Sequence, residues 1–495
     1  METEPDKCAA LDHNLRAFSY KALHDAVDLA QAILREAGVR AGDRVMVVAE
    51  NSVAHMAMAL ACSRLDAWVV PVNARLTESE LWHIRNHAQP RVCVFTTAAS
   101  SAAFNHAKNW NANFLSVEGL DDLAVLGQLD AKPEPVFLSP NEQVAVLIYT
   151  TGTMGSPKGV MLTHANFFFT INAGIDVRNL TDTDYVYTAP PHTHIFALTV
   201  TLASLTAGAK VRFVPRFEPE QVFQAFIEGV SVFPAVPAMY NRLLVHAQQV
   251  GIEKPDAPAL RYISAGGAPL DISWKQRVER FFDLPLQNGY GMTEAAPTLA
   301  MTRFDEHRQD THLGAPPKGL EIRIAETPGF SGGEGEILCR GPNIMLGYYR
   351  NPEETAAALD AEGFLHTGDI GIIHEDGSLQ LVGRVREVII RSGFNVYPGE
   401  IEAVLNQHAR VAQCAVVGRK VDSDEEVLAF IEVAGEEVFD LDEIKQHLRE
   451  RLSAYKQPRH IVVVEKLPAA PTGKLLRSNI VDSFSEQLQA LDATG

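Results

Sequence analysis

The sequence predicts an α/β protein with a large N-terminal domain of parallel-rich sheets packed with helices, a β-rich subdomain, and a small α+β C-terminal domain. In the first part of the chain, short apolar runs alternate with stretches of helical spacing, a pattern typical of parallel strands covered by helices on both faces. After about residue 314 the pattern changes to short strands separated by glycine turns. With 495 residues, the chain is also too long for one ordinary core.

The elements of the N-terminal domain, predicted over residues 1–383, follow from local signals. Residues 19–37 carry apolar side chains at helical spacing, with Ser19 as the candidate N-cap and Gly38 as the stop. Each predicted strand is a short apolar run, and we place these runs at residues 45–48, 92–95, 144–148, 211–214 and 230–233.

The β-rich subdomain is predicted over about residues 314–383. Residues 320–324 and 335–338 have the pattern of strands, and Asp376-Gly377 is a turn signal. Beyond residue 384, strand-like segments at 416–417, 430–433 and 461–464 alternate with a helical segment at 441–452. We therefore expect a compact C-terminal domain over residues 384–495.

Composition excludes several classes of partner and compartment. The formal net charge is 43 minus 62, or −19, and no Lys/Arg-rich run is present, which argues against nucleic acid as a partner. The N-terminus lacks a signal pattern, and no apolar run approaches the roughly 20 residues that span a bilayer. The five cysteines are scattered, which fits a reducing compartment and no zinc site: Cys8, Cys62, Cys93, Cys339 and Cys414. We expect a cytoplasmic protein without an integral membrane segment, and the oligomeric state is left open.

Two segments have the composition of phosphate-binding loops. Residues 149–159 combine glycines, which let backbone N–H groups converge on an anion, with hydroxyl side chains and Lys158. The P-loop of nucleotidases has glycine before the lysine and Ser or Thr after it, whereas Pro157 and Gly159 flank Lys158 here. Near the C-terminus, Lys474 ends a second glycine-containing segment, 471–474. A different class of nucleotide enzyme is therefore indicated.

Six glycine-containing clusters follow one another along the chain. They lie at residues 149–159, 266–269, 288–294, 366–369, 383–384 together with 393–402, and 471–474. In this order they resemble the adenylate-forming (AMP-binding) superfamily, in its branch of acyl-CoA synthetases and aryl-CoA ligases. The resemblance extends from about Phe18 to Arg477, nearly the whole chain. It implies ATP and Mg²⁺ as cofactors and CoA as co-substrate.

The resemblance assigns the first loop to the β- and γ-phosphates of ATP. The residues concerned are Thr150, Thr151, Gly152, Thr153, Gly155 and Lys158. This copy departs from the usual loop at Thr151, where serine is common, and at Met154, where threonine is common. The first change keeps a hydroxyl and the second removes a possible donor.

The resemblance also assigns the rest of the nucleotide site. Glu294 is expected to hold Mg²⁺, since a hard cation suits carboxylate and phosphate oxygens. Thr293 is expected at the α-phosphate, Tyr290 on adenine, and Asp369 at the ribose hydroxyls with Arg384 nearby. The remaining nucleotide-binding positions come from the same clusters: Gly266, Gly267, Ala268, Asn288, Gly289 and Gly291.

The C-terminal domain carries further roles by resemblance. Lys474 is expected to be the mobile cation that bridges carboxylate and phosphate during adenylation, and Arg386 marks the hinge about which the small domain moves. Gly393 would let the pantetheine arm of CoA pass close to the backbone.

Two histidines of the N-terminal domain are also considered. His194 is expected to line the acyl pocket by resemblance, while for His192 a role in packing is the rival interpretation. A zinc site at these two histidines lacks a third ligand.

The resemblance predicts an AMP-forming acid:CoA ligase, a carbon–sulfur ligase that activates a monocarboxylic acid. Synthetases for malonate-like diacids have an arginine at the position of Gly289, so a second carboxylate would be unpaired here. The acid can be fatty or aryl. Two alternatives stay open: a stand-alone adenylation enzyme that loads a carrier-protein pantetheine, and a catalytically inactive homologue that senses nucleotide or acyl ligands, suggested by Met154.

Overall fold

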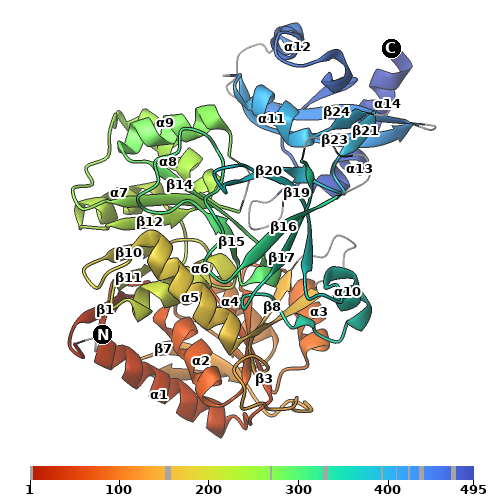
Figure 1. The fold of residues 1–495 in the computed structure, drawn as a ribbon. Coiled ribbons are helices and arrows are strands. Elements are labelled where there is room, and N and C mark those ends of the chain that lie inside the picture. The colour runs from red at the N-terminus through yellow and green to blue at the C-terminus, as the bar shows by residue number, and fades with distance from the viewer. Residues whose placement is uncertain are drawn as a thin grey trace.

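Two eight-stranded sheets form the body of the protein in the computed structural model (Figure 1). The structure describes residues 4–150, 158–267, 270–326, 330, 333–391, 394–408, 410–421, 424–433, 440–469 and 475–494. Figure 1 shows the small C-terminal sheet with α11 and α12 at one end of the molecule, and the N-terminus lies at the other end.

The first large sheet has parallel strands at its centre and antiparallel strands at both edges. Its order is β18 (Gly347–Tyr348), β9 (Lys158–Thr163), β8 (Val144–Thr150), β4 (Trp68–Asn73), β3 (Arg44–Ala49), β5 (Val92–Phe95), β7 (Asp121–Leu126) and β6 (Asn113–Val117). All six residues of β3 are buried, as expected for a central strand covered on both faces.

The second large sheet is also parallel in the middle, with an antiparallel strand at each end. Its order is β15 (Thr298–Met301), β14 (Leu286–Gly291), β13 (Tyr262–Gly266), β12 (Val232–Ala235), β10 (Tyr185–Thr188), β11 (Lys210–Phe213), β1 (Cys8–Leu11) and β2 (Ala17–Ser19). The prediction of parallel-rich sheets is therefore confirmed.

Helices cover both large sheets, and buried apolar clusters fill the space between them. They are α1 (Tyr20–Glu36), α2 (Val53–Arg64), α3 (Glu78–Ala88), α4 (Ser101–Asn109), α5 (His164–Arg178), α6 (Ile195–Thr206), α7 (Pro219–Ile227), α8 (Pro237–Val250), α9 (Ile272–Phe282), the 3-10 turn η1 (Thr293–Ala295) and α10 (Pro352–Ala358). Helix α1 begins as predicted, because the Ser19 side chain accepts a hydrogen bond from Ala22 N. None of the described helices is long and apolar enough to cross a bilayer.

A four-stranded antiparallel sheet follows the two large ones, where the sequence predicts β-rich structure. Its order is β16 (Glu321–Glu326), β17 (Gly335–Arg340), β19 (Leu365–Ile373) and β20 (Leu379–Arg384). Strands β19 and β20 are joined at the predicted turn, with Gly377 at a φ of +79°. Asp369 and Arg384 are cross-strand partners in this pair.

The C-terminal part combines two small sheets with short helices around its own apolar clusters. Its strands are β21 (Ile389–Arg391), β22 (Phe394–Val396), β23 (Val411–Val421), β24 (Asp424–Val433) and β25 (His460–Val464). Its helices are α11 (Pro398–Asn406), α12 (Leu441–Arg449), α13 (Ile480–Ser483) and α14 (Ser485–Thr494), with 3-10 turns η2 (Ala454–Lys456) and η3 (Arg477–Asn479). The mixed α+β character is as predicted.

Candidate active site

The segments predicted to surround the ligands converge at one edge of the second large sheet. Strands β10, β12, β13 and β14 are mutually parallel neighbours, so their carboxyl ends meet there. Ligands of α/β sheets bind outside such strand ends. The chain leaves this edge toward His194 after β10, toward Gly267 after β13, and toward Glu294 after β14.

Tyr290, Asp369 and Arg384, which come from three sequence clusters, lie in direct contact. The Tyr290 hydroxyl donates to Asp369 Oδ2 at 2.7 Å, and Arg384 Nε donates to Asp369 Oδ1 at 3.0 Å. Asp369 and Tyr290 are both buried. The burial of Tyr290, followed by the negative charge of Asp369, raises the pKa of the Tyr290 phenol well above its usual value. The phenol therefore stays protonated and acts as the donor. A buried carboxylate with a phenol on one oxygen and a guanidinium on the other is suited to accept further hydroxyl donors.

Lys158 and Glu294 are brought together by a residue that the sequence did not single out, Tyr348. The Tyr348 hydroxyl donates to Glu294 Oε1 at 2.9 Å, and the Lys158 ammonium lies 5.1 Å from the centre of the Tyr348 ring. Burial, followed by the charge of Glu294, raises the pKa of Tyr348, which keeps it a donor. Lys158 also forms an ion pair with Glu354 at the start of α10.

Tyr348 gave little signal in the sequence because it lies on a two-residue strand. Strand β18 pairs with β9, so that Tyr348 lies opposite Val160, two residues from Lys158. Strand β9 in turn pairs with β8, with Thr150 opposite Lys158. The two ends of the predicted phosphate loop are thus adjacent, as a loop around an anion requires.

Three glycines, Gly266, Gly289 and Gly291, lie at or near the ends of the neighbouring strands β13 and β14. A Cβ on Gly291 would lie 1.9 Å from the carbonyl oxygen of Pro297, so no larger residue fits this position without backbone movement. A Cβ on Gly289 would meet the end of the Met301 side chain at 3.0 Å, and one on Gly266 would meet the Gly289 carbonyl oxygen at 3.2 Å. The chain is therefore closely packed where an adenine wall is predicted.

The other predicted residues near β14 are polar and buried. Asn288 donates its side-chain amide to the Thr311 carbonyl at 2.8 Å, so this amide already has a protein partner. Thr293 is the first residue of η1 and is also buried.

Gly267, which directly follows the last residue of β13, has a φ of +83°, a conformation that favours glycine.

His194 and His192 have different surroundings. His194 is exposed and caps α6, where its Nδ1 accepts from Phe196 N at 3.3 Å. His192 is fully buried and lies 3.0 Å through Nε2 from Thr201 Oγ1, which agrees with its packed interpretation. Burial, then the neighbouring His55, lowers the pKa of His192 well below its usual value.

Asn51, which sequence reasoning missed, holds the segment that leads to His194. Its amide donates to the carbonyls of Thr188 and Pro190 at 3.1 and 2.9 Å, and its oxygen accepts from His192 N at 2.7 Å. Asn51 follows β3 of the first large sheet, whereas the segment it holds follows β10 of the second. Only the folded pairing of the two sheets reveals this contact.

Several predicted residues lie outside the residues that the structure describes. They are Thr151, Gly152, Thr153 and Gly155 in the first loop, Ala268 after Gly267, Gly393 after β21, and Lys474. The base of the Lys474 segment is described: Ala469 and Leu475 form an antiparallel bridge, and Leu476 N donates to the Pro468 carbonyl at 2.9 Å. Arg386, the predicted hinge, is exposed just beyond β20.

Glu294 fits the predicted Mg²⁺ role through its donor type, because carboxylate and phosphate oxygens are the ligands this cation prefers. Among the described residues, the groups of three or more Asp, Glu, His or Cys close enough to share a metal do not include Glu294. Most of the oxygens around the ion would then come from ATP and water.

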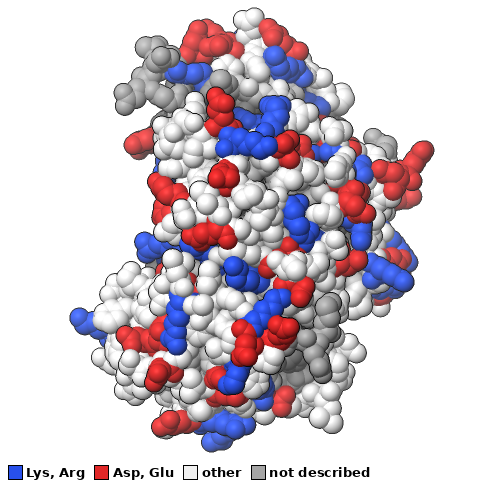
Figure 2. Space-filling view, turned by 90° about the vertical axis from the view of Figure 1, so that its left-hand side faces the viewer, with Lys and Arg blue, Asp and Glu red and all other residues white. Residues whose placement is uncertain are grey.

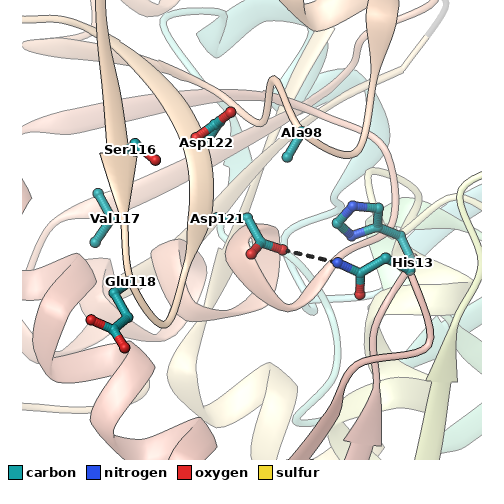
Figure 3. Close-up of a pocket in the computed structure, with 8 residues that line it drawn as sticks. His13, Ala98, Ser116, Val117, Glu118, Asp121 and Asp122 are labelled. Atoms are coloured by element: carbon teal, nitrogen blue, oxygen red, sulfur yellow. Dashed lines mark hydrogen bonds between the residues drawn. The ribbon is translucent and has the colours of Figure 1, made fainter.

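A polar hollow of about 530 Å³ lies elsewhere, beside the hairpin of β6 and β7 (Figure 3). His13 and Asp121 both line it, and the dashed line in Figure 3 marks the hydrogen bond that the Asn14 amide donates to Asp121 at 3.5 Å. Asp12, His13 and Asp121 are close enough to share a metal ion. Asp12 Oδ1 already accepts from His13 N at 2.8 Å and Val53 N at 2.9 Å, and Asp121 pairs with Arg16 at 3.3 Å. Contacts within the protein account for this cluster.

The surface carries both signs of charge. On the face that Figure 2 presents, Lys and Arg side chains are interspersed with Asp and Glu, with uncharged areas between them. A nucleic-acid-binding surface is instead a continuous basic area.

Comparison with known proteins places this geometry in context. A family model for the AMP-binding enzyme matches residues 1–349, and one for the AMP-binding enzyme C-terminal domain matches residues 400–474. Feruloyl-CoA synthase from an Amycolatopsis species is 33% identical over 494 residues and covers 96% of both chains. 4-Coumarate–CoA ligase 5 of Oryza sativa subsp. japonica is 33% identical over 471 residues, covering 90% of this chain and 86% of the relative. The ATP-bound structure of MatB from Rhodopseudomonas palustris superposes with a TM-score of 0.85 at 26% identity, covering 98% of this chain and 97% of that one.

Proposed function

The chain belongs to the AMP-binding enzyme family, and from that premise we propose that it is an AMP-forming ligase that joins an aryl acid of the hydroxycinnamate type to CoA. The observation that carries this proposal is the end-to-end similarity to feruloyl-CoA synthase, which leaves no large part of either chain unmatched. The coumarate–CoA ligases point to the same substrate class. ATP and CoA are the other two substrates, and Mg²⁺ is the metal cofactor.

The first half-reaction activates the acid. A carboxylate is a poor electrophile, so one of its oxygens attacks the α-phosphorus of ATP, and the bond from that phosphorus to pyrophosphate breaks. Two anions must meet, and cations with backbone donors offset their repulsion. Asp369 would hold the ribose, Thr293 the α-phosphate, and Lys158 with the 150–158 loop the outer phosphates. Glu294 would hold Mg²⁺, which neutralises phosphate charge when bound.

Lys474 would complete this half-reaction as a cation between carboxylate and α-phosphate. The described base of its loop, closed by the Ala469–Leu475 bridge, belongs to the C-terminal part of the chain. We include in the proposal a domain division near residues 383 and 384 with a hinge at Arg386, supported by the separate sheets on either side.

The second half-reaction transfers the acyl group to CoA. The thiolate attacks the carbonyl carbon of the acyl-adenylate, and the bond from that carbon to the AMP oxygen breaks. Gly393 would leave room for the pantetheine arm, and His194, at the start of α6, would border the acyl group. Gly289 and the neighbouring Met301 would form an uncharged wall, which suits an aromatic ring and disfavours a second carboxylate.

A cytoplasmic location is also part of the proposal. It is supported by five free cysteines, four of them buried and Cys8 partly so.

An acid panel with CoA tests the substrate class. Ferulate, 4-coumarate, benzoate and a series of fatty acids from acetate to palmitate are incubated with ATP, Mg²⁺ and CoA, and thioester and AMP are measured. The proposal predicts the highest kcat/KM for the hydroxycinnamates. Higher kcat/KM values for fatty acids would support the CoA-ligase activity but contradict the proposal that the substrate is an aryl acid. Turnover only with a carrier protein would favour the carrier-loading alternative, and ATP binding without pyrophosphate release would favour the inactive sensor.

A further inference from the structure

Alternating charges run from Asp369 to the base of the Lys474 loop. Asp369 Oδ1 lies 3.0 Å from Arg384 Nε, and the same guanidinium reaches Glu387 Oε1 through Nη1 at 3.8 Å. The other carboxylate oxygen of Glu387 lies 3.6 Å from Arg477 Nε. One carboxylate therefore faces two arginines, one through each oxygen.

Arg477 is held firmly on its far side. Its Nη2 donates to Glu402 Oε2 at 2.8 Å, and its Nη1 donates to the Val416 carbonyl at 3.0 Å. Glu402 in turn accepts from Val416 N at 2.7 Å. Arg477 is thus anchored to α11 and β23. Glu387 links it to Arg384 at the end of β20, and Arg384 in turn contacts Asp369 on β19.

Arg477 also lies just after the bridge that closes the Lys474 loop. Ala469 pairs with Leu475, and Leu476 N donates to the Pro468 carbonyl. Arg477 is two residues from Leu475, so a contact that holds the Arg477 side chain also helps to hold this bridge. On the other side, a short turn fixes Glu387: Glu387 N and Val388 N both donate to the Arg384 carbonyl, and Val385 N donates to the Gly368 carbonyl beside Asp369.

We propose that Glu387 is a positioning residue that couples nucleotide binding at Asp369 to the placement of residues 475–477, which directly follow the segment that carries Lys474. The inference rests on the proposed function, which gives Asp369 the ribose and Lys474 the reacting phosphate. When ribose hydroxyls also donate to Asp369, they share its negative charge with Arg384, so Arg384 is attracted relatively more to Glu387. Among the described residues, Glu387 is the carboxylate that contacts both Arg384 and Arg477.

The size of the effect follows from exposure. The side chains of Glu387 and Arg477 are 34% and 26% exposed, so water screens their attraction. Ion pairs of this kind change an equilibrium by about two- to fivefold. Loss of the Glu387 charge should therefore slow adenylation by about fivefold and leave thioester formation from supplied acyl-adenylate nearly unchanged.

The test uses the full chain with Glu387→Gln and a matched control, Glu465→Gln, at an exposed position of the same part of the chain. Hydrogen exchange at residues 475–479 is measured with and without AMP, beside the rates of both half-reactions with 4-coumarate. In the wild type and the control, the backbone amides of residues 475–479 should exchange more slowly when AMP binds. Glu387→Gln should bind AMP without that slowing and show the selective loss of adenylation, at an unchanged melting temperature.

A Glu387→Gln protein that matches the control in AMP-induced protection and in the ratio of half-reactions would overturn the inference. Glu387→Asp, which keeps the charge but shortens the side chain, is a second variant in case Glu387→Gln is unstable, and it should lose protection in part. If wild type binds no AMP, the proposed function fails. If it binds AMP and forms adenylate while the Glu387 variants behave like the control, this inference alone fails.

Discussion

The Tyr290 hydroxyl donates a 2.7 Å hydrogen bond to Asp369 and thereby joins β14 of a large sheet to β19 of the four-stranded sheet. The two residues are 79 positions apart in the chain. With Arg384 on the second oxygen of Asp369, the contact forms a buried acceptor beside an aromatic ring, which we propose binds the ribose of ATP.

Replacing Asp369 by Asn tests this acceptor. The amide keeps the shape of the carboxylate but loses its charge and one acceptor oxygen. Hydrogen bonds to charged groups contribute about 1.5–3 kcal/mol, so the Kd for ATP should rise about tenfold or more. Isothermal titration calorimetry measures this directly. Tyr290→Phe is the matched control: it keeps the ring and the Asp369 charge, and its Kd should change by less than about threefold. The reverse order of effects would assign the ribose elsewhere.

Lys474→Ala should separate the two half-reactions. Loss of one donor preorganised for the transition state costs about a hundredfold or more, so acid-dependent pyrophosphate release should slow by that factor. Thioester formation from supplied acyl-adenylate should stay close to wild type, because its phosphate bond is already made. Stopped-flow measurement of each half-reaction distinguishes these rates. Equal losses in both would be inconsistent with the assigned role.

The buried histidines predict how stability depends on pH. Burial lowers the pKa of His192 well below its usual value and that of His55 to about 4, from 6.5 in the unfolded chain. Above pH 6.5 both histidines are neutral in both states. As the pH falls below 6.5, the unfolded chain binds protons that the folded protein does not. The free energy of unfolding then falls by up to about 1.4 kcal/mol per pH unit for each histidine, until the folded pKa is reached.

His192→Asn should therefore flatten the decline in melting temperature between pH 6.5 and 5, as followed by circular dichroism. The control is His83→Asn, at an exposed position on α3, which should leave the slope as in wild type. An unchanged slope in His192→Asn would mean that this histidine is protonated in the folded protein.

Gly289→Trp tests the acyl pocket. An indole at this position would meet Met301 on the neighbouring strand and fill the space assigned to the acid. The kcat/KM for hydroxycinnamates should fall at least tenfold relative to acetate, as an excluded ring requires (~1.4 kcal/mol). A parallel fall for acetate or an unchanged acid profile would place the pocket elsewhere.

The strands that were predicted in the two large sheets are mostly buried on both faces and read as continuous apolar runs, whereas β4, β10 and β13 were not among the predicted runs. Residues 92–95 match β5 in full, and 144–148 match the start of β8. The run at 230–233 begins two residues before β12, since Ser231 N bonds to the Tyr185 carbonyl outside the strand ladder. The helix expected at 441–452 ends at Arg449, although Leu452 N still bonds to the Leu448 carbonyl beyond it.

The residues of the candidate site divide in the same way. Asp369, Glu294 and Lys158 could be chosen as candidates from the sequence because each lies in a cluster whose residue types suit phosphate, metal or ribose. Tyr348, Asn51 and Glu387 could not, because their contacts depend on sheet pairing or on partners far along the chain: Asn51 reaches Pro190 across 139 positions. Single polar or aromatic residues carry no periodicity, so only the assembled fold reveals them.

Acid-dependent exchange between ATP and pyrophosphate, measured without CoA, shows whether the protein forms an acyl-adenylate. The reaction requires only that an acyl-adenylate forms reversibly on the enzyme. Labelled pyrophosphate should enter ATP when 4-coumarate or ferulate is present, and the exchange should stop without the acid. ATP binding with no exchange for any acid of the panel would contradict the proposed adenylation.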